Sequence, residues 1–227
     1  MIRVTENLAL TLDLLSVSAI EAGREPNTVK LLAVSKKQPL SKILAAARAG
    51  QRDFGENFVQ EGLDKIEHTR NLNLVWHFIG HLQTNKTRIV AENFDWVHSI
   101  DKLKTARRLS EQRPKARGPL NICLQINIDD EDGKSGISAA ELPELAAACA
   151  ELPNLALRGL MCLPAEKTGI EEQKLPFRKI RELAIALRSG GIETDTLSMG
   201  MSGDYKAAIF EGATIVRIGT ALFGERI

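Results

Sequence analysis

The sequence predicts an α/β fold, a (β/α)8 TIM barrel preceded by one extra N-terminal helix. Eight short apolar segments recur along the 227 residues, and each is followed by a helical pattern or a helical turn. The length lies near the lower end of the range for that fold. No linker, repeat or low-complexity tract divides the chain, so residues 1–227 are expected to form one domain. An open, doubly wound sheet is the main alternative.

Each predicted element has a local signal. Helical spacing of apolar residues, followed by a glycine, predicts the extra helix on Val4, Leu8, Leu12, Leu15, Ala19 and Gly23. Apolar runs bounded by turn residues predict strands at 30–35, 52–56, 74–79, 95–100, 120–128, 155–163, 196–199 and 214–218. Helical patterns lie between them at 39–49, 57–70, 83–91, 102–112, 138–151, after 169 up to the pair of glycines at 190–191, and at 203–211. The spacing of Ser138 and Glu141 is that of a capping box.

The bulk composition excludes several classes of protein. Thirty basic residues against twenty-nine acidic ones leave a net charge of +1, which gives no electrostatic reason to expect nucleic acid or an anionic membrane as a partner. Three scattered cysteines form neither a disulfide framework nor a metal-ligand spacing, which favours a reducing, cytoplasmic setting. Glu6 and Asp13 interrupt the amino terminus, so no signal peptide is expected. No apolar run approaches the roughly 20 residues that span a bilayer.

The first strand ends abruptly in Lys36 and Lys37. A lysine at the carboxyl end of a buried strand can point into a cavity, where desolvation disfavours its charged form and makes it a nucleophile for a carbonyl. The ordinary alternative is a solvated strand end. Strand alternation does not choose between the two lysines, because both faces of this strand are apolar.

The loops after the seventh and eighth strands favour an anion site. In a barrel these loops often bind phosphate, and here they read Ser198-Met199-Gly200-Met201-Ser202-Gly203 and Arg217-Ile218-Gly219-Thr220. Glycines permit close backbone approach, and hydroxyls with free amides suit an anion. A plain helix cap is an equal explanation for Ser202 taken alone. A phosphate clamp facing a buried amine is what an aldehyde cofactor bearing a phosphate needs.

Three other motifs carry weaker signals. Gly133-Lys134-Ser135 resembles part of a P-loop, but Ile128 stands where the first glycine of that motif belongs. The four residues between Ile128 and Gly133 are all acidic and would repel a triphosphate. His77 and His81 are four apart, like a metal pair on a helix, but His77 belongs to a predicted strand. Asn57 with Gln60 fits a helix cap as well as a binding role.

Over nearly its whole length the chain resembles the single-domain pyridoxal phosphate homeostasis proteins, which are related in fold to the barrel domain of alanine racemase. The matching segments are Ala33-Val34-Ser35-Lys36, Phe54-Gly55-Glu56-Asn57, His77-Phe78-Ile79-Gly80 through Leu82-Gln83 to Asn85-Lys86, Lys134-Ser135-Gly136, Ser198-Met199-Gly200-Met201-Ser202, and Val216-Arg217-Ile218-Gly219 to Phe223-Gly224. Together they form a highly specific signature. His81, between Gly80 and Leu82, departs from the smaller or more rigid residue expected there.

The resemblance implies the cofactor and the role of each site residue. Pyridoxal 5′-phosphate (PLP) is expected to form a Schiff base with Lys36, so the family pattern chooses this lysine over its neighbour. By the same comparison, Ser202, Gly219 and Thr220 hold the phosphate, Arg217 lies near the pyridine nitrogen, and Asn57 and Met201 line the pocket. No metal is implied.

The implied site favours a carrier over an enzyme. An arginine donates hydrogen bonds and does not accept them, so it tends to leave the pyridine nitrogen unprotonated and the ring a weaker electron sink. Racemisation also needs acid–base groups on both faces of the substrate, and the resemblance places the second group on a domain that this chain lacks. The only tyrosine of this chain, Tyr205, lies in the helix predicted after the seventh strand.

We therefore expect a protein that carries and buffers PLP, with apo-enzymes as transient acceptors. A PLP-dependent amino-acid racemase is one alternative, and a barrel enzyme that uses a lysine Schiff base without the cofactor is another. A monomer suits a barrel with no second domain to build a shared site.

Overall fold

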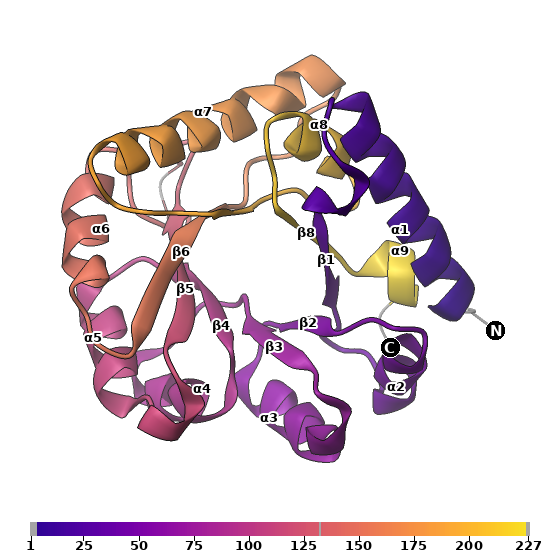
Figure 1. Ribbon diagram of the computed structural model, residues 1–227, viewed down its shortest axis with the longest axis horizontal. Coiled ribbons are helices and arrows are strands. Elements are labelled where there is room, and N and C mark those ends of the chain that lie inside the picture. Colours follow the sequence, from indigo (N-terminus) through magenta and orange to yellow (C-terminus); the bar gives the residue numbers. More distant parts are fainter. Residues whose placement is uncertain (1–3, 132, 226–227) are drawn as a thin grey trace.

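The computed structural model describes residues 4–131 and 133–225 and shows a closed barrel of eight parallel strands in sequence order (Figure 1). The last strand pairs with the first over four residues, which rules out the open doubly wound sheet and confirms the predicted barrel. The strands are β1 Lys30–Val34, β2 Asp53–Glu56, β3 Val75–Phe78, β4 Trp96–Ile100, β5 Leu120–Ile126, β6 Leu155–Cys162, β7 Thr196–Ser198 and β8 Ile215–Ile218.

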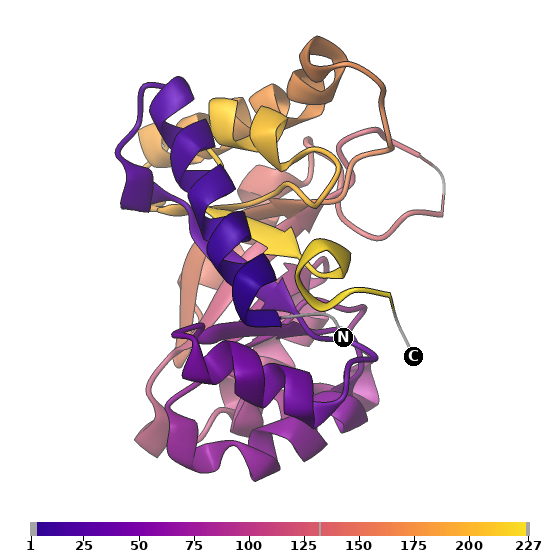
Figure 2. The same cartoon turned by 90° about the vertical axis from the view of Figure 1, so that its right-hand side faces the viewer.

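Helices form a ring outside the barrel, and most of them connect one strand to the next along the sequence (Figures 1 and 2). They are α1 Val4–Glu21, α2 Leu40–Arg48, α3 Val59–His68, α4 Thr87–Asn93, α5 Leu103–Gln112, α6 Leu142–Ala150, α7 Ile170–Ser189, α8 Tyr205–Phe210 and α9 Thr220–Phe223. The extra helix α1 packs against α2, α8 and α9, so it covers the seam where β8 meets β1.

One predicted helix start is wrong by a few residues. The helix predicted from residue 138 begins at Leu142, because Pro143 lies in its first turn and fixes the start there. The backbone N–H and the hydroxyl of Ser138 both donate to one carboxylate oxygen of Glu141, at 2.9 and 2.7 Å. This pair closes a turn ahead of the helix and does not cap it.

The buried face of α1 also differs from its prediction. Leu12 is 42% exposed, whereas Thr11 is buried, because steps of four and three residues place Val4, Leu8, Thr11 and Leu15 on one face. The hydroxyl of Thr11 donates to the carbonyl of Asn7 at 2.7 Å, which removes the cost of burying it.

The strands separate two different interiors. Residues that face the helices form the apolar core, and Phe54, Phe78 and Val97 in it are wholly buried. The alternate residues face the inside of the barrel, where Trp96, Cys123 and Met161 form a small cluster of their own. The Trp96 ring stacks on His77 with centroids 5.3 Å apart, so aromatic and polar side chains meet inside the barrel.

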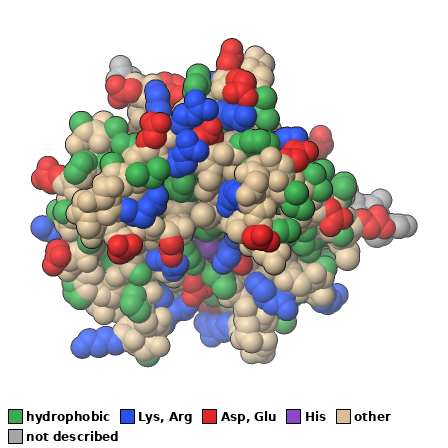
Figure 3. Space-filling view, turned by 45° about the horizontal axis from the view of Figure 1, so that its top comes forward, with side chains coloured by type: hydrophobic (Ala, Val, Ile, Leu, Met, Phe, Trp, Pro, Cys, Tyr) green, Lys and Arg blue, Asp and Glu red, His purple; other side chains and the backbone are tan. Residues whose placement is uncertain are grey.

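The outer surface carries charges of both signs. On the face shown in Figure 3, basic and acidic side chains are interspersed rather than gathered into a patch of one sign. Among the helices within 4–131 and 133–225, none combines the length and the apolar character that crossing a bilayer requires.

Candidate functional site

A cavity of about 480 Å³ opens at the carboxyl ends of the strands, where active sites of such barrels lie. It brings together all seven residues that the sequence pointed to, although they come from four different strand ends. The lining residues are Val34, Lys36, Asn57, Ile79, Met161, Leu163, Glu166, Lys167, Gln173, Met201, Ser202, Gly203, Asp204, Arg217, Gly219 and Thr220. Their roles toward a ligand stay predictions.

The end of β1 separates the two candidate lysines. Lys36 is half-buried and lines the cavity, whereas Lys37 is exposed. The backbone of Lys37 is left-handed, with φ of 55°, which is uncommon for a residue with a side chain. The chain therefore turns sharply after Lys36 and carries the second lysine away from the cavity.

A buried ionic cluster holds this turn, and the sequence reasoning missed it. The ammonium of Lys65 on α3 donates to the carbonyl of Ser35 at 2.7 Å. It also donates to the carboxylates of Glu56 at 2.7 Å and Glu61 at 2.6 Å. Glu61 in turn accepts the backbone N–H of Lys37 at 2.5 Å. The four-residue spacing of Glu61 and Lys65 was the only sequence signal for this cluster.

Glu56 is the least solvated member of the cluster. Its side chain has no exposed surface, and burial raises its pKa, an effect that Lys65 partly offsets. The hydroxyl of Ser35 donates to the same carboxylate at 2.6 Å. The residue that precedes Lys36 is therefore fixed through both its side chain and its carbonyl.

Asn57 lies at the end of β2 and lines the cavity rather than capping a helix. The helix begins two residues later, and no side chain caps its start at Phe58. Gly80 packs against the backbone of Asn57 so closely that a β-carbon there would lie 2.1 Å from the Asn57 carbonyl oxygen. The side-chain oxygen of Asn57 is buried and accepts no hydrogen bond from the described residues. Buried polar atoms are normally satisfied, so a bound molecule with a donor group fits here.

The loops after β7 and β8 form one end of the cavity. Gly200 has φ of 93°, a conformation that suits glycine, and it starts the turn that presents Met201 and Ser202. The hydroxyls of Ser202 and Thr220 both line the cavity.

Asp204 completes this end of the cavity and was not anticipated. Its carboxylate accepts the N–H of Met201 at 2.6 Å. Burial raises the pKa of Asp204, an effect that the Met201 hydrogen bond and the Arg217 charge partly offset.

Arg217 on β8 lies in the floor of the cavity and is 4% exposed. Its Nη1 donates to the carbonyl and the hydroxyl of Ser198, at 2.5 and 2.9 Å, and its Nη2 donates to the carbonyl of Cys162 at 2.8 Å. Burial lowers the pKa of the guanidinium, yet this group stays protonated in proteins. Three of its five N–H groups are engaged in these bonds, and the others remain for a ligand.

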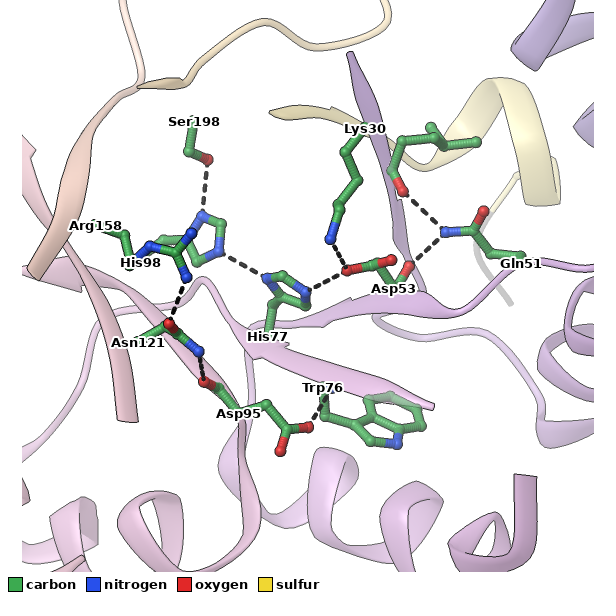
Figure 4. A network of polar contacts seen from close by, with 11 residues as sticks. Lys30, Gln51, Asp53, Trp76, His77, Asp95, His98, Asn121, Arg158 and Ser198 are labelled. Atoms are coloured by element: carbon green, nitrogen blue, oxygen red, sulfur yellow. Dashed lines mark hydrogen bonds and ion pairs between the residues drawn. The ribbon is translucent and has the colours of Figure 1, made fainter. Parts of the chain in front are cut away.

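From Ser198, which accepts a hydrogen bond from Arg217, a line of polar side chains crosses the inside of the barrel to Lys30 (Figure 4). Ser198 Oγ lies 2.7 Å from His98 Nδ1. His98 Nε2 lies 2.9 Å from His77 Nδ1, and His77 Nε2 lies 3.0 Å from Asp53 Oδ1. Lys30 Nζ donates to the same oxygen of Asp53 at 3.0 Å.

The other sequence motifs take no part in the cavity. His77 is buried and His81 is exposed, and His81 is not among the cavity residues, so the two do not form a metal pair. Lys134 pairs with Glu131 at 2.6 Å on the surface, and the next helix begins only at Leu142. Across residues 4–131 and 133–225, no group of three His, Cys, Asp or Glu side chains converges to hold a metal ion.

Known proteins share this fold and this chain length. A family profile described as the alanine racemase N-terminal domain matches residues 18–227. A pyridoxal phosphate homeostasis protein of Escherichia coli K12 is 54% identical over 98% of this chain and 97% of its own. The structure of PipY from Synechococcus elongatus with PLP bound is 35% identical, with a TM-score of 0.83 over 97% of this chain and 100% of the other.

More distant structures share the fold alone. Alanine racemase from Corynebacterium glutamicum is 18% identical, with a TM-score of 0.70 over 97% of this chain and 61% of the racemase.

The fold and the lysine-bearing cavity at its strand ends therefore define a barrel protein of the alanine racemase N-terminal type. Within that class, the near full-length match at 54% identity shows that the chain belongs to the pyridoxal phosphate homeostasis protein family.

Proposed function

We propose that this protein binds PLP at Lys36 and carries it reversibly, as a member of the cell's PLP homeostasis system. One observation supports the proposal above the others. A single cavity holds a half-buried lysine, a buried arginine and two hydroxyl-bearing loops, and the relative with PLP bound is similar over nearly all of this chain.

The residues present fit the group. When bound, PLP supplies an aldehyde that a lysine amine takes up reversibly. In this proposal Lys36 provides the amine, and the loops that contain Ser202, Gly219 and Thr220 hold the phosphate. The unpaired side-chain oxygen of Asn57 offers an acceptor to a donor group on the ligand.

Two further residues complete the proposed pocket. Arg217 donates a hydrogen bond toward the ring nitrogen, and Met201 lines one wall. The cluster of Lys65, Glu56 and Glu61 holds the backbone on both sides of Lys36, through the carbonyl of Ser35 and the N–H of Lys37.

A carrier fits the cavity better than a racemase does. Tyr205 opens α8 and does not line the cavity, so the chain's single tyrosine is not placed to serve as a second acid–base group. The likeness to alanine racemase and to D-threonine aldolase is at 18% identity and concerns the fold.

In the cell, we propose, the protein is a cytoplasmic monomer in which residues 1–227 form one domain, and it passes PLP to apo-enzymes. The three cysteines are unpaired and buried, and burial raises the pKa of Cys123 and of Cys162 to about 12, so neither forms a reactive thiolate. This suits a reducing compartment.

Absorbance tests the proposal directly. The purified protein mixed with PLP is expected to show a visible band that borohydride removes, and peptide mapping is expected to find the reduced adduct on Lys36. Lys36→Ala is expected to abolish the band. Lys37→Ala is the matched control, because this neighbouring lysine is exposed and outside the cavity, and it is expected to keep the band.

Transfer needs a separate measurement. The loaded protein is mixed with an apo-enzyme that requires PLP, and recovery of that enzyme's activity is followed over time. Recovery supports the carrier role. Proton exchange at the α-carbon of an amino acid in deuterium oxide, catalysed by the loaded protein, would instead favour the racemase alternative.

A further inference from the structure

The line of hydrogen-bonded side chains inside the barrel has a group that can only donate at one end and a group that can only accept at the other. At the upper end Arg217 can only donate hydrogen bonds, so Ser198 Oγ must accept from it. At the lower end Asp53 accepts from both His77 and Lys30. Burial alone would raise the pKa of Asp53, but the hydrogen bonds from His77 and Lys30 outweigh it and leave the pKa below its ordinary value. The carboxylate is therefore ionised and can only accept.

With both ends fixed, the two histidines have a single arrangement that satisfies every contact. His77 donates from Nε2 to Asp53, so its Nδ1 is the acceptor for His98 Nε2–H. The Nδ1 atom of His98 then accepts from the hydroxyl of Ser198. Every bond in the line runs in one direction, from the arginine toward the carboxylate.

Burial keeps both rings neutral, as this arrangement requires. His77 and His98 have no exposed surface. Burial lowers the pKa of His77, with Asp53 partly opposing the effect, and lowers the pKa of His98 well below its ordinary value. A proton added to His77 would force His98 to donate to Ser198, and the hydroxyl hydrogen would lose its acceptor.

We propose that His77 and His98 are positioning residues that act on the cavity through Arg217. Because the line has one direction, the Ser198 oxygen always faces the guanidinium as an acceptor. This holds one amino group of Arg217 against β7, so that its free N–H groups keep a constant direction in the cavity. The inference rests on the proposed function, in which those groups meet the ring nitrogen of PLP.

Nitrogen NMR of the imidazole rings tests the line without any cofactor. The chain has four histidines, so single His→Gln variants assign the spectrum. At neutral pH, His77 and His98 are both expected to carry their proton on Nε2 and to have a bare Nδ1. A proton on Nδ1 of either ring, or a doubly protonated ring, would overturn the inference.

A double-mutant cycle tests the action through Arg217. His98→Leu is expected to raise the dissociation constant for PLP about tenfold, the scale of one hydrogen bond to a charged group, and to alter the pH dependence of the visible absorbance. His98→Gln keeps an acceptor and a donor and is expected to restore both. In an Arg217→Lys background, His98→Leu is expected to add no further effect.

An equal effect of His98→Leu on PLP affinity in the native and Arg217→Lys backgrounds, or no effect in the native background, would overturn the inference. His68→Leu, at an exposed position on α3, is the matched control and is expected to bind PLP like the native chain. No uptake of PLP by the native protein would overturn the proposed function as well, whereas wrong tautomers in a protein that binds PLP would overturn this inference alone.

Discussion

The two sides of the barrel wall differ in chemistry although the same strands build both. In β2 and β3, Phe54 and Phe78 face the helices and are wholly buried in the apolar core, whereas Asp53 and His77 face inward and hydrogen-bond to each other. Because residues of opposite parity point to opposite faces of a strand, we expect stability to depend mainly on the outer residues and the proposed ligand binding on the inner ones. A change on one side is expected to leave the function of the other side largely intact.

The cluster of Lys65, Glu56 and Glu61 is an exception to this division, because it places buried charge in the outer layer. Lys65→Met is expected to destabilise the fold by about 3–5 kcal/mol, since it leaves the carboxylate of Glu56 buried without its partner. Urea unfolding measures the loss. Adding Glu56→Gln is expected to recover part of it.

The control for this variant is the same substitution at an exposed ion pair. Lys206 pairs with Glu21 at 2.7 Å on the surface, and Lys206→Met is expected to leave the unfolding midpoint nearly unchanged. Equal losses from the two lysines would show that burial of the Lys65 cluster contributes nothing special.

The inner face is expected to make stability depend on pH. Because the pKa values of His77 and His98 are lowered in the folded state, the unfolded chain binds more protons than the folded one below about pH 6.5. Stability is therefore fully present above that pH and falls as the pH drops toward the folded pKa values. The slope is up to about 1.4 kcal/mol per pH unit for each histidine.

Urea titrations over this pH range measure that slope. His98→Gln is expected to flatten it, and His68→Gln to keep the part that His77 and His98 cause. A native slope that His98→Gln leaves unchanged would contradict the assignment of neutral buried histidines.

The smallest effect is expected from a single methylene of the apolar core. Ile43→Val on α2 removes one methylene from a fully buried site and is expected to cost about 1 kcal/mol. The affinity for PLP is expected to stay the same. Ile20→Val, at a position of α1 that is 59% exposed, controls for the substitution itself and is expected to change neither quantity.

The sequence was sufficient to predict the strand ends but not the inside of the barrel. The rule that active sites lie after parallel strands pointed to the pair Lys36 and Lys37 and to the loops that contain Ser202 and Gly219. The choice of Lys36 over Lys37 came from the family resemblance, and the cavity gathers Lys36 with both loops. The contacts of His98 with His77 and with Ser198 were not predicted, because they form only once β3, β4 and β7 share a closed barrel. A usable signal was present, since each is a polar residue inside an apolar strand.

The seam beneath α1 has a consequence for how the chain reaches its native state. β1 bonds to β8, and α1 packs on α8 and α9, so elements near opposite ends of the sequence must meet before the ring is complete. Until residues 205–223 leave the ribosome, the edge of β1 that pairs with β8 and the part of α1 that packs on α8 and α9 have no partner. Contacts this distant along the sequence form late and slowly, so the final closure is expected to limit the rate of maturation.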